Sequence, residues 1–214
     1  LTVQEIKKFI NNDAASVKKQ LAKTGLRYYE GRHDIKDYRI FYIDADGKVK
    51  EDKTKSNIRI SHPFFAEIVD QIVPYLLSGK DRIIKSDNPA LQEQLDAYFN
   101  DNDAFVAELA ETITGVQAKG FDWMFANRDE DGKTRFQWAD CMGVVECEAK
   151  YTSDKRNYVI YYYEDRIDND GNRIVNIRVY DDTQVWFYTC VNDGEIKPDD
   201  SIKPNPQPHS IFQM

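Results

Sequence analysis

Apolar residues in the stretch from residue 57 to residue 80 recur as adjacent pairs, with successive pairs four residues apart. The pairs are Phe64-Phe65, Ile68-Val69, Ile72-Val73 and Leu76-Leu77. This spacing is typical of an α-helix and places all eight side chains on one broad face. The pattern therefore predicts a long helix with that face buried in the core.

The residues around this helix predict where it begins and ends. Ser61 and His62 offer N-cap chemistry, and Pro63 suits a first helical position, which needs no amide donor. Gly79 offers a left-handed stop. Inside the helix, Pro74 removes one backbone hydrogen bond and crowds the carbonyl four residues back, which predicts a kink near residue 70.

Two helices are expected before this stretch. Thr2 and Glu5 have the spacing of a capping box, followed by the apolar Ile6, Phe9 and Ile10. In the second helix, Val17, Leu21 and Tyr28 fall on one side with lysines opposite, and Gly31 is the expected stop. Gly25 weakens this helix by about 1 kcal/mol relative to alanine without ending it.

Between the second helix and the central one, the pattern changes to that of extended chain. Residues 38–43 are rich in β-branched and aromatic side chains and lead to Asp46-Gly47, which predicts a small hairpin or extended arm. Residues 50–57, KEDKTKSN, are then expected to form a solvated, mobile connector.

After the central helix, residues 82–85 are predicted to form a short strand, and two further helices follow. The first begins at Asn88-Pro89 and carries the apolar residues Leu91, Leu95, Tyr98 and Phe99. The second begins at Asp103, ends at Gly120 and is expected to turn inward Phe105, Leu109, Ile113 and Val116. Five helices thus precede any long β region.

From residue 121 the chain consists of aromatic and β-branched runs separated by Asp-Gly turns, which predicts an antiparallel β meander. A proline-rich tail, with Pro198, Pro204, Pro206 and Pro208, follows from Glu195 and resembles an exit segment. The expected fold class is α+β. We divide the chain into a mainly helical part (residues 1–120), an antiparallel β part (121–194) and the exit segment (195–214).

Composition narrows the range of functions. The formal net charge of −8 and the isoelectric point near 5.0 argue against a protein that binds nucleic acid by neutralising phosphates. Cys141, Cys147 and Cys190 form no CxxC pair and have no histidine nearby, which favours a reducing compartment over a zinc site. No apolar run approaches the length of a membrane span. Because the first residue is Leu1, we expect the natural start to lie upstream.

Two Asp-Gly sites resemble the start of an EF-hand calcium loop. They are Asp44-Ala45-Asp46-Gly47 and Asp168-Asn169-Asp170-Gly171. Neither keeps the glycine and the later glutamate in the register that such a loop needs. We interpret both as hairpin turns.

A possible nuclease site consists of Asp140, Glu148 and Lys150. In metal-dependent nucleases two carboxylates bind Mg²⁺ and a lysine orients the attacking water. The alternative interpretation is a half-buried strand, with Val145 and Cys147 turned inward and the charged residues outward. The latter is favoured, since no basic surface accompanies the motif.

No phosphate-binding glycine loop, GxSxG or HExxH motif is present, and His33, His62 and His209 lack ligand spacing. The tyrosines of NYVIYYYED are next to Glu164 and Asp165 rather than to basic residues, so we interpret them as core and interface residues and not as base-stacking groups. We assign no catalytic, cofactor-binding or metal-binding residue.

Several segments, in this order, resemble the SPP1-type phage portal proteins of tailed phages and prophages of Gram-positive bacteria. They are YYEGRHDI, NIRISHPFFAEIVDQIVPYLLSGK, LQEQLDAYFNDNDAFVAELAE, AKGFDWMFANRDEDGKTRFQW, and YVIYYYED followed by IRVYDDTQVWFY. The resemblance covers most of the chain, and its specificity lies in the order of the segments.

The resemblance implies a structural subunit of a portal ring, usually a dodecamer, at the capsid vertex. DNA driven by the terminase passes through such a ring without sequence-specific binding, and the subunits are not enzymes and need no cofactor. The chain would correspond to the outer wing region and would stop before the stem, clip and crown. Implied partners are further copies of the chain, terminase, capsid or scaffold and head-completion proteins, in the virion and earlier in the bacterial cytoplasm. The alternatives are a Mg²⁺-dependent nuclease and a generic protein-binding module.

Overall fold

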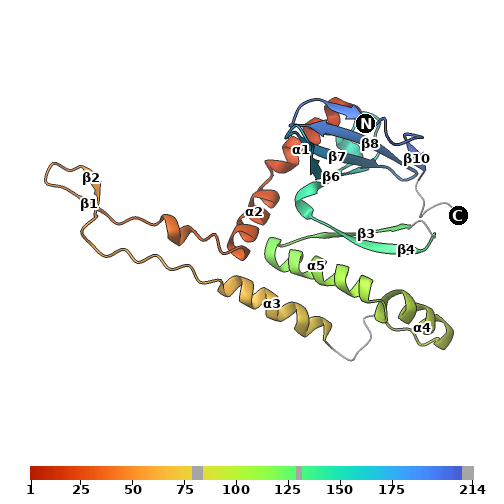
Figure 1. Ribbon diagram of the computed structural model, residues 1–214, viewed down its shortest axis with the longest axis horizontal. Helices are drawn as coiled ribbons and strands as arrows, with labels where there is room; N and C mark the ends of the chain where they lie inside the picture. Colours follow the sequence, from red (N-terminus) through yellow and green to blue (C-terminus); the bar gives the residue numbers. More distant parts are fainter. Residues whose placement is uncertain (79–83, 129–131, 209–214) are drawn as a thin grey trace.

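The computed structural model describes residues 1–78, 84–128 and 132–208 (Figure 1). It has the predicted α+β fold, with five α-helices before the long strands. The helices are α1 (Val3–Ala14), α2 (Val17–Tyr29), α3 (Phe64–Leu77), α4 (Pro89–Leu95), which continues as a π-helix over Asp96–Asn100, and α5 (Asp103–Lys119). None of the helices in these ranges is long and apolar enough to cross a bilayer.

The predicted antiparallel meander is confirmed, but it divides into two sheets. β3 (Trp123–Arg128) and β4 (Thr134–Ala139) pair only with each other in a sheet of their own. The larger sheet has the order β10-β8-β7-β6-β5, and β9 also pairs with β8. Its strands are β5 (Val144–Cys147), β6 (Tyr158–Ile167), β7 (Arg173–Tyr180), β8 (Gln184–Val191), β9 (Ile196–Pro198) and β10 (Gln207–Pro208). The proline-rich tail therefore returns twice to the outer edge of β8.

Helix α1 covers the large sheet and forms the main core with it. The predicted capping box is present: Thr2 accepts a hydrogen bond from the amide of Glu5, and the Glu5 carboxylate accepts one from the amide of Thr2. Ile6 is completely buried among sheet residues that include Ile160 and Ile177. The first helix thus packs on the β part of the molecule, whereas α2, α3 and α5 pack on one another.

Helix α2 buries a different face from the one predicted. Val17 and Leu21 are 75% and 66% exposed, while Lys19, placed on the polar side by the pattern, is only 1% exposed. The reason is that α2 approaches α5 closely at Gly25, where a side chain would meet the backbone of Ala118, and this narrow contact has no room for large apolar side chains.

Helix α3 buries only half of its predicted apolar face. Val69 and Val73, the second members of their pairs, are buried, but Phe64 and Ile68 face the solvent. A single neighbouring layer covers a strip of the helix, and the rest of the broad face is left uncovered. The helix continues through Pro74 to Leu77, and the kink near residue 70 stays a prediction.

The predicted caps of α3 were wrong in part. The helix begins at Phe64 after Pro63, and no side chain caps it. Ser61 instead donates a hydrogen bond to the carbonyl of Gly31 and contacts the His33 ring, which ties together the two chains that lead away from the helices. The predicted stop, Gly79, lies outside the described residues.

Two predictions around α4 and α5 also need correction. Of the segment 82–85, residues 82 and 83 lie outside the described ranges, and Ile84 and Lys85 are not in a strand. The side chain of Asn100 binds both the amide and the carbonyl of Ile84, which satisfies the backbone groups that a strand would use. In α5, Phe105 is buried as predicted, but Val116 is exposed, and the helix end turns Ala118 and Lys119 inward.

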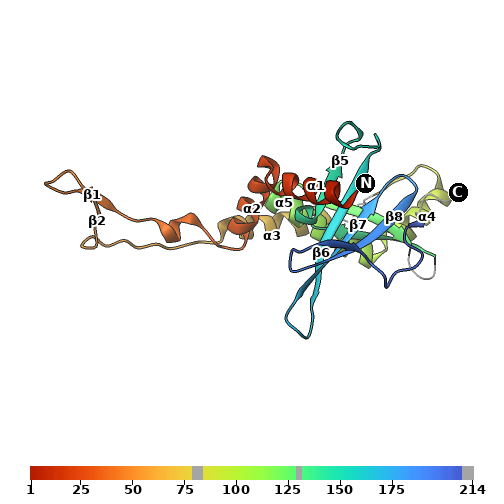
Figure 2. The same cartoon turned by 90° about the horizontal axis from the view of Figure 1, so that it is seen from above.

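The predicted arm is present and projects far from the rest of the molecule (Figures 1 and 2). It comprises residues 32–63 and contains a 3₁₀ turn (Asp34–Asp37) and the hairpin of β1 (Phe41–Ile43) and β2 (Val49–Glu51). The turn is of the predicted kind, because Asp44 accepts hydrogen bonds from the amides of Asp46 and Lys48. Asp168 plays the same part in the β6–β7 turn.

Candidate functional site

Charged side chains gather where the helices meet the β part of the molecule. At the end of α5, the ammonium of Lys119 lies 2.8 Å from a carboxylate oxygen of Asp122 and 2.8 Å from one of Asp140. Burial on its own would lower the pKa of Lys119, but hydrogen bonds to the two carboxylates outweigh it and raise the pKa above its ordinary value. Lys119 therefore stays charged and forms an ion pair with each of the two carboxylates.

Asp122 is the most deeply buried member of this group, and its side chain is completely buried. It accepts hydrogen bonds from the backbone amide of Cys141, at 2.6 Å, and from the indole nitrogen of Trp138, at 2.7 Å. Its carboxylate packs against Gly115 of α5, where a side chain would clash with it. Because Gly115 has no Cβ, the buried ion pair of Asp122 and Lys119 fits against the helix.

A second buried lysine, Lys19, binds the same connecting segment from the other side. Its ammonium pairs with Asp13 at 2.9 Å and donates to the backbone carbonyls of Cys141 and, at 2.8 Å, Val144. These acceptors compensate the cost of burying the charge. We call the five residues Lys19, Lys119, Asp13, Asp122 and Asp140 the lysine junction, since they fasten α1, α2 and α5 to the start of β5.

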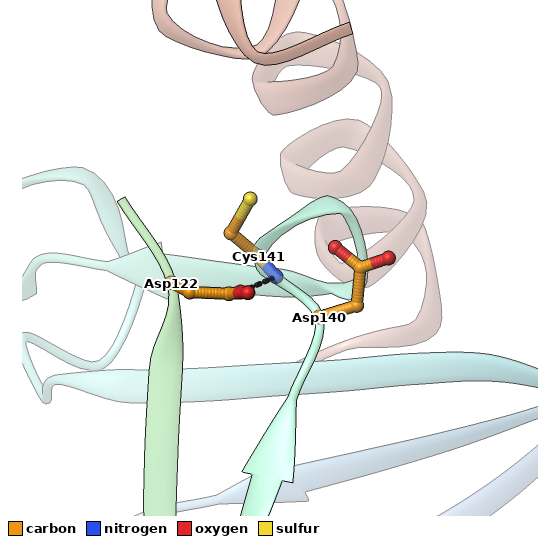
Figure 3. Close-up of side chains that lie close together, drawn as sticks. All are labelled: Asp122, Asp140 and Cys141. Atoms are coloured by element: carbon orange, nitrogen blue, oxygen red, sulfur yellow. Dashed lines mark hydrogen bonds between the residues drawn. The ribbon is translucent and has the colours of Figure 1, made fainter. Parts of the chain in front are cut away.

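Part of the junction has the composition of a metal site. Ligand atoms of Asp122, Asp140 and Cys141 lie within 4.8 Å of one another (Figure 3). The charge that a cation would supply already comes from Lys119, and burial raises the pKa of the Cys141 thiol to about 12, although Lys119 opposes this rise. The thiol is therefore protonated and a poor ligand. We interpret the cluster as a structural ion-pair network.

Exposed apolar residues mark a second kind of surface. On α3 they are Phe64, Ile68, Tyr75 and Leu76, and on the arm they are Ile35, Tyr38, Phe41, Tyr42, Ile43, Val49, Ile58 and Ile60. Scattered exposed apolar residues are ordinary, but a concentration on one helix and one arm is typical of an interaction surface. The arrangement suits a molecule that binds other macromolecules better than one that encloses a small substrate.

Comparison with known proteins agrees with this picture. The family model described as phage portal protein, SPP1 Gp6-like, matches residues 7–213 of the chain. The chain belongs to this portal protein family. The portal protein of Bacillus phage SPP1 is 30% identical to it over 186 residues, which cover 86% of this chain and 36% of that protein. The chain thus spans about a third of the length of the curated relative that it matches.

In this portal-family chain, the nuclease motif is not assembled. Glu148 lies just after β5, not on a strand as predicted, and its carboxylate pairs with Lys150 on the exposed surface. Asp140 pairs with Lys119, and it clusters with Asp122 and Cys141 and not with Glu148. The nuclease alternative therefore has no support from the geometry or from the family.

Sequence reasoning missed the lysine junction altogether. Lysines on a helix are usually solvated, so Lys19 and Lys119 did not stand out. A usable signal was the spacing of Lys19, Ala22 and Gly25, three residues apart, since small residues such as Ala22 and Gly25 on one helix face allow a neighbouring helix to approach closely. The partner of that face, α5, could not be identified from the sequence.

Proposed function

We propose that this chain is the wing region of a phage portal protein and acts as a structural subunit without enzymatic activity. In this proposal its copies form a closed ring, usually a dodecamer, at the capsid vertex through which DNA is packaged and ejected. The observation that carries the proposal is the family match over residues 7–213, almost the whole chain. The likeness to the SPP1 portal protein supports it.

The exposed surfaces support a role in assembly. A ring requires head-to-tail contacts between different faces of neighbouring subunits, and such faces have apolar centres. The uncovered face of α3 and the arm provide apolar residues of this kind. The net charge of −8 would disfavour adhesion of DNA to the wall of a conduit.

We also propose partners for the protein and a role for each of the three segments of the chain. Capsid or scaffold, terminase and head-completion proteins would bind the protein expressed from its complete reading frame, in the virion and in the bacterial cytoplasm during assembly. We propose that residues 1–120 and 121–194 form the two parts of the wing and that residues 195–214 lead out of it. The packing of α1 on the large sheet indicates that the two parts share a core.

Electron microscopy and light scattering of the protein expressed from its complete reading frame test this proposal. We expect annular particles of uniform subunit number, and we expect plasmid DNA incubated with Mg²⁺ to stay intact. A protein that remains monomeric at high concentration would contradict the ring. Cleavage of the plasmid that is lost on Glu148→Ala, and not on Glu146→Ala, would instead support the nuclease.

A further inference from the structure

The arm has an apolar face that no other described residue of the chain covers. In the hairpin, Ile43 pairs directly with Val49, and Phe41 lies two residues before Ile43 on the same face. These three side chains are 71%, 69% and 60% exposed, respectively. A hairpin of two strands is at best marginally stable in water. An additional surface is therefore needed to hold the arm in one conformation.

The arm is also basic, although the chain is acidic. Residues 36–60 carry seven lysines and arginines against five aspartates and glutamates, within a chain of net charge −8. The arm's own ion pairs use Lys50, Arg39 and Lys55. Within the described residues Lys48, in the hairpin turn, and Lys53, just after β2 at the base of the hairpin, make no ion pair. Their charge is available to an acidic partner.

A matching surface lies on α4 of the same chain. Residues 86–118 contain seven carboxylates and no lysine or arginine. Four of these carboxylates, those of Asp87, Glu93, Asp96 and Asp101, line a hollow of about 780 Å³. Nearby, α4 and its π-helical continuation expose Leu91 and Tyr98, which adds apolar area to the acidic surface. Basic and apolar groups on the arm thus have acidic and apolar counterparts here.

The two surfaces lie at opposite ends of the molecule. The arm extends from one end of the long axis and α4 lies at the other, in both views (Figures 1 and 2). One copy cannot bring its own arm to its own α4. A contact between them must therefore join two copies head to tail, which is the kind of contact that closes into a ring.

We propose that the arm of one subunit binds the acidic hollow at α4 of the next subunit. This inference rests on the proposed ring function and names the contact that links its members. Lys48 and Lys53 face the carboxylates of the hollow, and the apolar face of β1 and β2 covers Leu91 and Tyr98. The partner is a second copy of this chain, selected by charge and by exposed apolar area.

A charge-swap experiment on the protein expressed from its complete reading frame tests the contact. Lys48→Glu with Lys53→Glu, and separately Glu93→Lys with Asp101→Lys, each place like charges opposite each other. Each pair of substitutions should raise the concentration needed for half-assembly by about tenfold or more, measured by light scattering. Combining all four substitutions restores opposite charges and should bring assembly back. Loss that the combination does not restore would overturn the contact.

The controls separate this inference from the proposed function. Lys8→Glu with Lys23→Glu changes the net charge equally at exposed positions outside both surfaces and should assemble like the unchanged protein. If the unchanged protein forms rings and the arm variants do so equally well, the arm contact is wrong and the ring stands. If the unchanged protein forms no ring, the proposed function fails first.

Disulfide trapping provides a second readout. Lys48→Cys combined with Glu93→Cys should give a ladder of covalent oligomers under mild oxidation, and either substitution alone should give none. The three cysteines of this chain are buried and free, and the protein without either introduced cysteine measures any background. Ring particles that yield no ladder would place the arm elsewhere, on a capsid protein or on DNA, and would overturn the proposal.

Discussion

The lysine junction and the arm invert the ordinary distribution of polar and apolar residues in opposite ways. At the junction, Lys19 and Asp122 are charged and buried. On the arm, Phe41 and Ile43 are apolar and exposed. The buried charges have partners within the chain, which fixes how the helices meet the sheet. The exposed apolar groups have none within the described residues.

The two regions therefore have different roles in the same fold. A buried ion pair tolerates little displacement, because a charge that loses its partner in a low dielectric is strongly destabilising. The junction therefore specifies the internal geometry of the subunit. The arm contributes little to that geometry, and its residues are available for contacts between molecules. Substitutions in the first region should change the free energy of unfolding, and those in the second should change assembly.

The largest effect is expected from breaking the junction at Lys119. Lys119→Met leaves the completely buried carboxylate of Asp122 without its cation and should lower the free energy of unfolding by about 3 to 5 kcal/mol. Denaturant unfolding of the protein measures this value. Lys150→Met, which breaks the exposed pair with Glu148, should cost less than about 1 kcal/mol.

A double variant checks that the effect comes from the pair. Lys119→Met with Asp122→Asn removes the buried charge together with its partner. It should cost less than the sum of the two single substitutions, which a double-mutant cycle measures. Costs that simply add would mean that the two side chains act independently, and the junction would lose its role as a buried ion pair.

A smaller effect is expected at the contact of α2 with α5. A side chain at Gly25 would clash with the backbone carbonyl of Ala118, which cannot move away as a flexible side chain could. Gly25→Ala should therefore destabilise the protein by about 2 kcal/mol, despite the better helix propensity of alanine. Lys23→Ala, at an exposed position on the same helix, should change the free energy of unfolding by less than about 0.5 kcal/mol. Stabilisation by Gly25→Ala would show that the helices separate easily.

Much of the fold could be predicted because its signals are local. The capping box at Thr2, the Asp-Gly hairpin turns and the helix end at Gly120 depend on a few neighbouring residues and were confirmed. Amphipathic periodicity found all five helices. It failed for the buried face of α2 and for half of the α3 face, because which face is covered depends on the neighbouring layer.

The junction could not be predicted for a different reason. It joins Lys19, Asp122 and Asp140, which are far apart in the sequence. The local sequence around each of them gives no sign that the side chain is buried. Asp140 was noticed, but it was grouped with Glu148 because the two are close in the chain. In the structure its partner is Lys119, and Asp122 lies within 4.8 Å of it. Closeness in the sequence suggested the wrong partner for Asp140, because its contacts are determined by how the helices pack on the sheet.

A pH dependence should report on the capping box of the first helix. Hydrogen bonds from Thr2, together with those from Ser153, lower the pKa of Glu5 from 4.5 to about 2. Because the folded pKa is the lower one, Glu5 stabilises the fold fully above pH 4.5 and loses this contribution as the pH falls towards 2. Glu5→Gln should be less stable than the unchanged protein at pH 7, and the difference should shrink steadily as the pH falls from 4.5 towards 2. Thermal unfolding at several pH values measures the difference.

The smallest effect on folding is expected on the arm. Phe41→Ser with Ile43→Ser removes two apolar side chains that are already in water, so the free energy of unfolding should change by less than about 0.5 kcal/mol. Assembly should nevertheless be lost, since the same side chains would be buried against α4 of the next subunit. Thr54→Ser, a conservative change elsewhere on the arm, should leave both quantities unchanged. A large loss of stability in the monomer would mean that the arm folds back on its own chain, and the division between the two regions would fail.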